Sequence, residues 1–543
     1  MIQVRTFLVF PLLAALSLSA FAQQPSDSFG EVIDVRVVNV EVVVTDKDGT
    51  RVTGLKPGDF RLRVDGKEVP VDFFIEVADR QAVPPASDQA QPAAATASGG
   101  TVGTWYLVFV DDFFALAPHR NQVLEMLRND LSRLGPNDRM AMVAFDGGRL
   151  QMLSSWTNSP ADLSRAFSTA MARPARGPLR STELREMLNN ETFTAATEDP
   201  YADGAPSMNN RMLNYGLSLS EKAYGSTLAR QLQAEISAVV SAMRATSGVP
   251  GRKVLLLLSG GWPFSIQSYI RGEEDTSMTR ELPDGEELYR PLTTTANLLG
   301  YTLYPVDVPG IQAEAASAGT AQSGGGSRFR ELEVEGALSF LAEETGGRPL
   351  MNTQRANVLQ VAENDTRSYY WLGFTPTWLH NDKPHRVEVD LLRPGLTARY
   401  RNSFVDLSKQ ASTSMLLESA LLFGNLPNAI PMPVKVGAIK RKKGSTEVPL
   451  TLALPVSAFT VVPLDGKHRA KLELRFAATD EQGNRSDIQT LPLELASDKE
   501  PKAGGYVKYE TKLTIKGQPR HLVLATYDPL SGKIATAQAD LPE

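Results

Sequence analysis

The pattern of apolar positions changes character twice along the chain. Over residues 30–78, short runs alternate apolar and polar side chains, as at Phe60, Leu62 and Val64, and turn signals at 46–49 and 65–66 separate these runs. Alternation with a period of two is typical of half-buried antiparallel strands. The sequence therefore predicts a small N-terminal β module over 30–78, followed by an Ala-, Pro- and Gln-rich linker over 79–102.

Continuous apolar runs alternate with amphipathic segments over residues 103–365. The runs at 106–110 and 254–258 have the length and composition of fully buried strands. Between such runs, apolar residues recur every three or four positions, which is typical of helices that cover a sheet. This alternation predicts an α/β domain with a doubly wound, mostly parallel sheet, interrupted by a polar insertion over 172–225.

Antiparallel patterns return over 366–405 and again over 410–543. Neither 30–78 nor 366–405 has enough strands to be stable alone. We therefore expect these two segments to pair into one flanking sandwich, with the α/β domain inserted between them. Turn signals at regular spacing predict an all-β, sandwich-like domain over 410–543. The predicted fold class is α/β, flanked by antiparallel β-sandwich-like modules.

The first 22 residues have the pattern of a secretory signal peptide. Arg5 precedes an apolar stretch, and small residues at Ala20 and Ala22 flank the expected cleavage point. No later run reaches about 18 uninterrupted apolar residues, so we expect no transmembrane span in the mature chain. The predicted location is the periplasm or the outside of the cell, after cleavage near Ala22.

Composition narrows the chemistry that is open to the chain. The 543 residues include 56 Lys and Arg against 62 Asp and Glu, a net charge of -6, which argues against a nucleic-acid-binding surface. There is no Cys and there are five scattered His, so no thiolate or imidazole metal centre is expected. No nucleophile elbow, zinc-protease or phosphate-loop motif occurs. We therefore predict no catalytic residue and no resident cofactor.

Several phrases along the chain carry a family resemblance. They occur at 38–46, 52–60, 341–348, 370–374 and 393–401. In this order and spacing they resemble the secreted bacterial von Willebrand factor A-related family known mainly from acidobacteria. The resemblance covers about residues 30–405 and implies a von Willebrand A fold at about 103–365.

The resemblance also implies where a divalent cation would bind. Domains of this class commonly use Asp-x-Ser-x-Ser after the first strand and an Asp after the fourth strand. Here Asp111 occupies the first position, but Phe113 and Ala115 replace the two serines. Ser259-Gly260-Gly261 stands where Ser-Asp-Gly would be expected. We interpret the metal site as degenerate, because a hard cation needs those oxygen ligands.

Residual cation binding is an alternative that the residues leave open. Asp111 and Asp112 could hold a divalent cation with help from Asp199 or Asp203 in the insertion. Adjacent carboxylates at a strand end are more commonly turn formers or helix caps.

We expect ligand contact at the carboxyl-end edge of the central sheet. Asp111, Asp112, Ser259 and Trp262 should converge there, because loops gather at that edge. Trp262 after a Gly-Gly turn favours contact with a protein, and packing of Trp262 under the insertion is an equal alternative. These features predict an exported, non-catalytic protein-protein interaction or adhesion protein with a partner in the envelope or outside the cell.

Two other functions remain as hypotheses. An exported hydrolase could use Glu198, Asp199 and Asp203 of the insertion, because paired carboxylates can perform acid-base chemistry on sugars. A metal-dependent adhesin would require the cation described above. The glycine run 324–326 is predicted to be a flexible loop, and the basic run 440–443 is predicted to be a hairpin tip.

Overall fold

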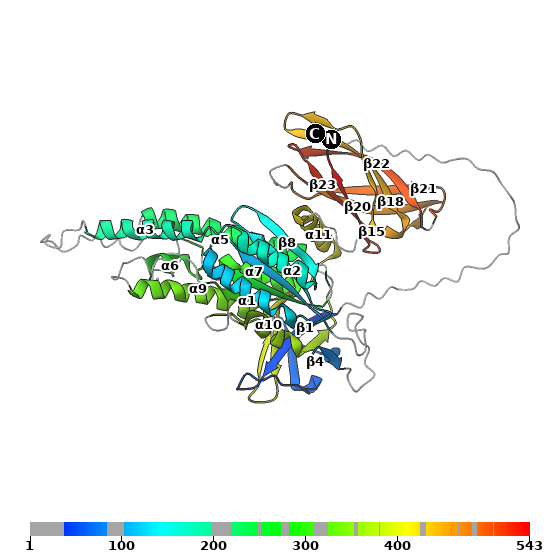
Figure 1. The fold of residues 1–543 in the computed structure, drawn as a ribbon. Coiled ribbons are helices and arrows are strands. Elements are labelled where there is room, and N and C mark those ends of the chain that lie inside the picture. Colours follow the sequence, from blue (N-terminus) through cyan, green and yellow to red (C-terminus); the bar gives the residue numbers. More distant parts are fainter. Residues whose placement is uncertain are drawn as a thin grey trace, which may run out of the picture. The chain divides into compact units, whose positions relative to one another are not determined.

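The computed structural model divides the chain into two compact units (Figure 1). The larger unit contains Val38–Phe374 and Trp378–Leu407, and the smaller one contains Ser408–Glu543. Each unit is described by itself. The structure describes residues 37–83, 102–196, 219–247, 249, 251–272, 282–283, 285–308, 324–351, 357–378, 381–423, 430–464, 466–480, 486–502 and 504–542.

A five-stranded mixed sheet forms the centre of the larger unit. Its order is β10 (Tyr301–Asp307), β9 (Arg252–Ser259), β6 (Thr104–Asp111), β7 (Arg139–Phe145) and β8 (Leu150–Thr157). The first four strands run parallel, and β8 pairs antiparallel with β7 at one edge. The parallel strands are buried almost throughout, which explains why they are apolar runs without alternation.

Helices pack against both faces of this mixed sheet. On one face, Val108 and Val110 of β6 share a core with side chains of α1 (Ala117–Asn129), α2 (Pro160–Ala172) and α10 (Val358–Arg367). The opposite face is contacted by α5 (Leu219–Ala245), α7 (Gly285–Leu299) and α9 (Gly324–Glu344). The helices α3 (Gly177–Ala196), α5, α6 (Ile266–Arg271) and α9 extend together on one side of the unit (Figure 1).

Two antiparallel sheets stand beside this α/β layer in the same unit. One has the order β13 (Thr397–Tyr400), β1 (Val38–Thr45), β11 (Tyr369–Phe374), β4 (Phe73–Ala78) and β5 (Gln81–Val83). The other has the order β14 (Ser403–Val405), β12 (Pro384–Leu391), β2 (Phe60–Val64) and β3 (Lys67–Val69). Val42, Leu62 and Leu372 belong to one apolar core that both sheets share. Together the two sheets form a sandwich.

Strands from both ends of the α/β region interleave in this sandwich. β1 and β4 both pair with β11, and β2 pairs with β12. The segments 38–83 and 369–405 are therefore parts of one sandwich, with the α/β layer between them in the sequence. The backbone ties the two ends of that layer together, because Arg80 N donates to the Arg367 carbonyl at 2.8 Å and Val102 N donates to the Arg80 carbonyl at 2.8 Å.

The smaller unit has two facing sheets and one helix. The first sheet has the order β15 (Ile430–Pro431), β24 (Ile534–Asp540), β23 (His521–Tyr527), β20 (Lys467–Thr479) and β19 (Val462–Leu464), with β21 (Gln489–Ser497) also on β20. The second contains β16 (Val434–Val436), β18 (Ser445–Pro455), β17 (Lys440–Lys442) and β22 (Tyr506–Lys516). Leu450 and Leu474 meet in the core between the sheets. The basic run 440–443 lies at the β17–β18 hairpin, as predicted.

The α/β class and the antiparallel β modules predicted from the sequence are confirmed at this coarse level, but several local predictions are wrong. The 410–543 region is not all-β, because α11 (Lys409–Phe423) buries Leu417 and Ala420 against Val523 and Ala525 of β23. Gly324–Gly326 form the first turn of α9 rather than a loop. α9 packs against β10 and α6, and it includes these glycines although each one destabilises a helix by about 1 kcal/mol relative to alanine.

The insertion 172–225 is partly helical. Its first part forms α3, and α5 begins at Leu219 before the insertion ends. Residues 1–22, most of the linker 79–102 and the acidic stretch Glu198–Asp203 lie outside the described residues. Among the described residues, no helix is long and apolar enough to cross a membrane.

Candidate functional site

The structure brings the four predicted contact residues together at the carboxyl ends of two neighbouring strands. Asp111 ends β6 and is followed by Asp112, while Ser259 ends β9 and is followed by the turn that carries Trp262. All four side chains are buried, each with 0% of its surface exposed. Their predicted role in ligand contact stays a prediction, and a partner would meet the residues that cover them.

Asp111 holds the local turn together. Its Oδ1 accepts hydrogen bonds from the backbone N–H groups of Phe113 at 2.9 Å and Phe114 at 2.8 Å. Its Oδ2 accepts from the indole Nε1 of Trp262 at 3.0 Å, and the Trp262 ring stacks on Tyr289. Burial raises the pKa of Asp111 to about 6, although these three donors oppose the rise.

Asp112 is held by two arginines. Its Oδ1 accepts from Arg120 Nη1 at 2.5 Å, and its Oδ2 accepts from Arg173 Nε at 2.5 Å. Arg120 also donates to the Arg173 carbonyl at 2.8 Å, so the guanidinium fastens the end of α2 to the strand end. Asp112 and Arg120 form a buried ion pair, because both side chains are almost fully buried.

The backbone between Phe113 and Ala115 occupies the space next to Gly260. A Cβ atom at position 260 would lie 2.6 Å from the Ala115 Cα and 2.7 Å from the Phe114 carbonyl oxygen. Only glycine fits there, which gives a physical reason for the absence of a carboxylate at this position. Phe113 and Ala115, which stand at the two serine positions of the resemblance, are themselves buried.

The hydroxyl of Ser259, next to this site, has no hydrogen-bond partner among the described residues. A further carboxyl group, that of Glu235 on α5, lies within hydrogen-bonding reach of Asp111. Glu235 is fully buried, and its burial, together with the nearby Asp111 and Asp112, raises its pKa well above the usual value. Sequence reasoning missed Glu235, because a glutamate on a long helix carries no signal that it faces inward.

The described residues contain no group of three or more His, Asp or Glu side chains that could hold a metal ion. Asp199 and Asp203, the helpers considered for residual cation binding, lie outside the described residues, as does Glu198. Every oxygen of Asp111 and Asp112 already accepts a bond from a protein donor. Protein donors therefore occupy the carboxylate oxygens that a cation would need, and the degenerate metal site stays a prediction.

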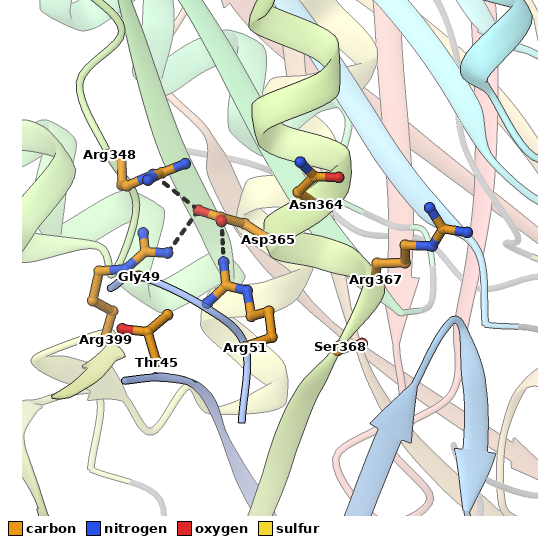
Figure 2. A pocket seen from close by; sticks show the side chains of 9 residues that line it. All are labelled: Thr45, Gly49, Arg51, Arg348, Asn364, Asp365, Arg367, Ser368 and Arg399. Carbon is orange, nitrogen blue, oxygen red and sulfur yellow. Dashed lines mark hydrogen bonds and ion pairs between the residues drawn. The ribbon is translucent and has the colours of Figure 1, made fainter. Parts of the chain in front are cut away.

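A second candidate site lies where the sandwich meets the α/β layer. A cavity of about 340 Å³ is lined from both sides, and Figure 2 shows the side chains that line it. Thr45, Gly49, Arg51 and Arg399 come from the sandwich. The α/β side contributes Arg348, Asn364, Asp365, Arg367 and Ser368. We call these nine residues the arginine pocket.

Three arginines of the pocket converge on the buried carboxylate of Asp365 (Figure 2). Arg51 forms an ion pair with Oδ1, and Arg399 Nη2 donates to Oδ2 at 2.8 Å. Arg348 Nε lies 3.4 Å from Oδ2. Burial raises the pKa of Asp365, but the three guanidinium groups lower it more, so that it lies below its ordinary value.

The sequence contained a partial signal for this pocket. Arg348 and Arg399 stand within two of the phrases that carry the family resemblance, at 341–348 and 393–401. Arg51 follows the turn at 46–49, and Asp365 sits at the end of an ordinary amphipathic helix. Nothing in the sequence indicates that Arg51 meets the others, since it lies 314 residues before Asp365.

The comparisons with known proteins are distant. No family model matches the sequence, and no curated protein matches it. Among solved structures, bovine butyrophilin is 7% identical with a TM-score of 0.13, covering 33% of this chain and 65% of that chain. A beta-glucosidase from Kluyveromyces marxianus is 9% identical with a TM-score of 0.14, covering 57% of this chain and 33% of that chain. The alkylpurine DNA glycosylase AlkC of Pseudomonas fluorescens, bound to DNA, is 10% identical with a TM-score of 0.13, covering 78% of this chain and 99% of that chain.

This chain thus spans just under two thirds of the butyrophilin chain and a third of the glucosidase chain. At these TM-scores the likenesses carry no argument about fold or function.

Proposed function

We propose that residues 103–365 form a von Willebrand A-like, doubly wound domain, and that the chain is an exported, non-catalytic interaction protein. The sheet order β8–β7–β6–β9–β10 supports the fold assignment, because the first strand of the layer is central and the chain winds outward to both sides of it. The helices on both faces agree with this winding. The leader pattern of residues 1–22 supports export.

One observation carries the proposal of metal-independent binding. At the edge where this class of domain binds a cation, Asp111 is hydrogen-bonded by neutral N–H groups, Asp112 is paired with arginines, and Gly260 packs directly on the 114–115 backbone. The edge is therefore held in one arrangement without a cation. A rigid, preformed edge suits a binding surface, because little conformational freedom is lost on association.

The surface above this edge is formed by residues 176–180, which we call the edge segment. Arg176 N donates to the Asp112 carbonyl at 2.7 Å, and Gly177 N donates to the Ala115 carbonyl at 3.1 Å. Leu179 of this segment is 55% exposed, in contrast to the buried residues below it. We propose that the edge segment contacts a protein partner in the envelope or outside the cell.

The test uses the mature full chain as bait on native envelope fractions, with and without a chelator. A defined partner should be captured in both conditions, and Leu179→Ser should weaken its capture. Leu392→Ser is the matched control, because Leu392 is 51% exposed on the sandwich.

Two outcomes would overturn this function. Capture that the chelator abolishes would favour the metal-dependent adhesin. Turnover of a glycan panel by the purified chain would favour the hydrolase hypothesis with its site at 198–203.

A further inference from the structure

The arginine pocket holds more positive charge than its own residues neutralise. Arg51, Arg348 and Arg399 face the single carboxylate of Asp365, which leaves an excess of two positive charges. The fourth arginine, Arg367, is set apart from this group, because its Nε donates to Asp79 at 2.5 Å. The excess therefore belongs to the three arginines that converge in Figure 2.

Among the described residues, no second carboxylate forms an ion pair with Arg51, Arg348 or Arg399. Arg252 is buried nearby, but its charge is paired with Glu41 at 3.4 Å, and its guanidinium lies over the Tyr369 ring at 4.4 Å. Burial and the neighbouring Arg399 and Arg252 lower the pKa of Arg51, while Asp365 opposes this change. Partly desolvated cations without counter-charges are costly, and a bound anion removes that cost.

The pocket also has an unused hydrogen-bond donor. Arg51 Nη1 is buried and has no hydrogen-bond partner among the described residues. A guanidinium presents five N–H donors in a planar fork, which matches the oxygens of phosphate or carboxylate. Asp365 accepts from Arg399 and from the Tyr304 hydroxyl at 3.0 Å, and Arg399 Nη1 donates to the Gly347 carbonyl at 3.2 Å. These bonds position Arg399, while Arg51 Nη1 stays available to a ligand.

Charge and volume together define the ligand. A phosphomonoester carries a charge of about -1.5 to -2 at pH 7, which balances an excess of two, whereas a single carboxylate balances only half of it. The cavity volume of about 340 Å³ corresponds to roughly ten water molecules, which is room for a phosphate and part of the group that bears it. We propose that the arginine pocket binds the dianionic phosphate of a phosphomonoester, held by Arg51, Arg348 and Arg399.

This inference is independent of the proposed function, because the arginine pocket and the edge segment share no residue. The experiment is isothermal titration calorimetry of the full mature chain with inorganic phosphate, phosphoserine and glucose 6-phosphate. Sodium chloride and sodium acetate at matched ionic strength serve as comparison ligands. Saturable binding of at least one phosphate, tighter than acetate and chloride, is expected. The preference between inorganic phosphate and the two esters identifies the source of the group.

The informative variant is Arg348→Gln, because Arg348 is partly exposed and makes the longest of the three contacts with Asp365. We expect phosphate binding to weaken about tenfold or more when this charged donor is lost. Arg386→Gln is the matched control, since Arg386 is exposed on β12 and does not line the pocket. Its phosphate affinity should equal that of the wild type.

Three results would overturn the proposal. Heats of phosphate binding no larger than those of chloride would show that the pocket takes no specific anion. Equal affinity for acetate and phosphate would contradict the charge argument. Unchanged phosphate affinity in a folded Arg348→Gln variant would place any binding elsewhere on the chain.

Discussion

The buried carboxyl of Glu235 makes the stability of the larger unit dependent on pH, and Glu235→Gln should remove that dependence. Glu235 is fully buried, and its pKa in the folded chain is raised by burial, by the charges of Asp111 and Asp112, and by a side-chain hydrogen bond with Asp111. The unfolded chain has an ordinary glutamate, with a pKa of about 4.3. The native state therefore keeps a proton that the unfolded state has lost.

The sign follows from this difference in bound protons. The stabilising contribution of Glu235 is complete below the unfolded pKa and decreases as the pH rises toward the folded pKa. Each pH unit in which only the unfolded carboxyl is ionised lowers the free energy of unfolding by about 1.4 kcal/mol. Glutamine has nearly the same shape and no proton to lose, so the variant should lack this slope. Above pH 6, where Asp111 is largely ionised, the wild type should lose up to about 1.4 kcal/mol per pH unit relative to the variant.

Urea denaturation followed by tryptophan emission measures the stability of the larger unit, to which Glu235 belongs. The five tryptophans, at positions 105, 156, 262, 371 and 378, all belong to the larger unit, so the signal does not report on the smaller one. Glu186→Gln on α3 is the matched control, because Glu186 is exposed and the same chemical change there should leave the pH slope of the wild type. The reasoning is refuted if Glu235→Gln and the wild type show the same slope between pH 6 and pH 8.

Three further predictions concern the same end of the mixed sheet. The raised pKa of Asp111, about 6, makes the wild type lose about 3 kcal/mol of stability between pH 4 and pH 7, and Asp111→Asn should remove this loss. Urea titrations at several pH values measure the effect, and an unchanged pH profile would contradict the burial of Asp111. Asp112→Ala should lower the free energy of unfolding by about 3–5 kcal/mol, since Arg120 would remain buried without its counter-charge; a cost below about 1 kcal/mol would show that the pair is solvated. Gly260→Ala should cost about 1–3 kcal/mol in thermal or urea unfolding because the added Cβ meets the Ala115 backbone, and a neutral result would mean that the two segments are not in close contact.

Local patterns were sufficient to predict many elements but not all of them. The continuous apolar runs at β6 and β9 were recognisable because strands buried on both faces need apolar side chains at every position. The Asp65-Gly66 hairpin was also predictable, since both residues adopt positive φ angles there that few other pairs tolerate. α11 was missed because Leu417 and Ala420, which it buries, belong to the short apolar segment 415–423, and so short a segment does not distinguish a helix from a strand.

The candidate sites depend on contacts that a one-dimensional pattern does not contain. The convergence of Asp111, Ser259 and Trp262 could be anticipated, because strand ends in a parallel sheet meet at one edge. The complete burial of these side chains could not be anticipated, since it depends on the backbone at 113–115 and on the segment that follows α2. The arginine pocket needed the three-dimensional fold, because the sandwich and the α/β layer contribute its opposite walls.

The interleaved sandwich has a consequence for the order in which the chain folds. Glu41 and Trp371 are register partners 330 residues apart, and closing an unstructured loop of that length costs about 5 kcal/mol in chain entropy. If the α/β layer folds first, its ends at Val102 and Arg367 come close together, both bonded to Arg80 of the sandwich, and most of that entropy is lost beforehand. We therefore expect the sandwich to form last in the larger unit. In that order β1 stays unpaired during synthesis until β11 has left the ribosome, and its valine-rich strand is exposed to aggregation in the meantime.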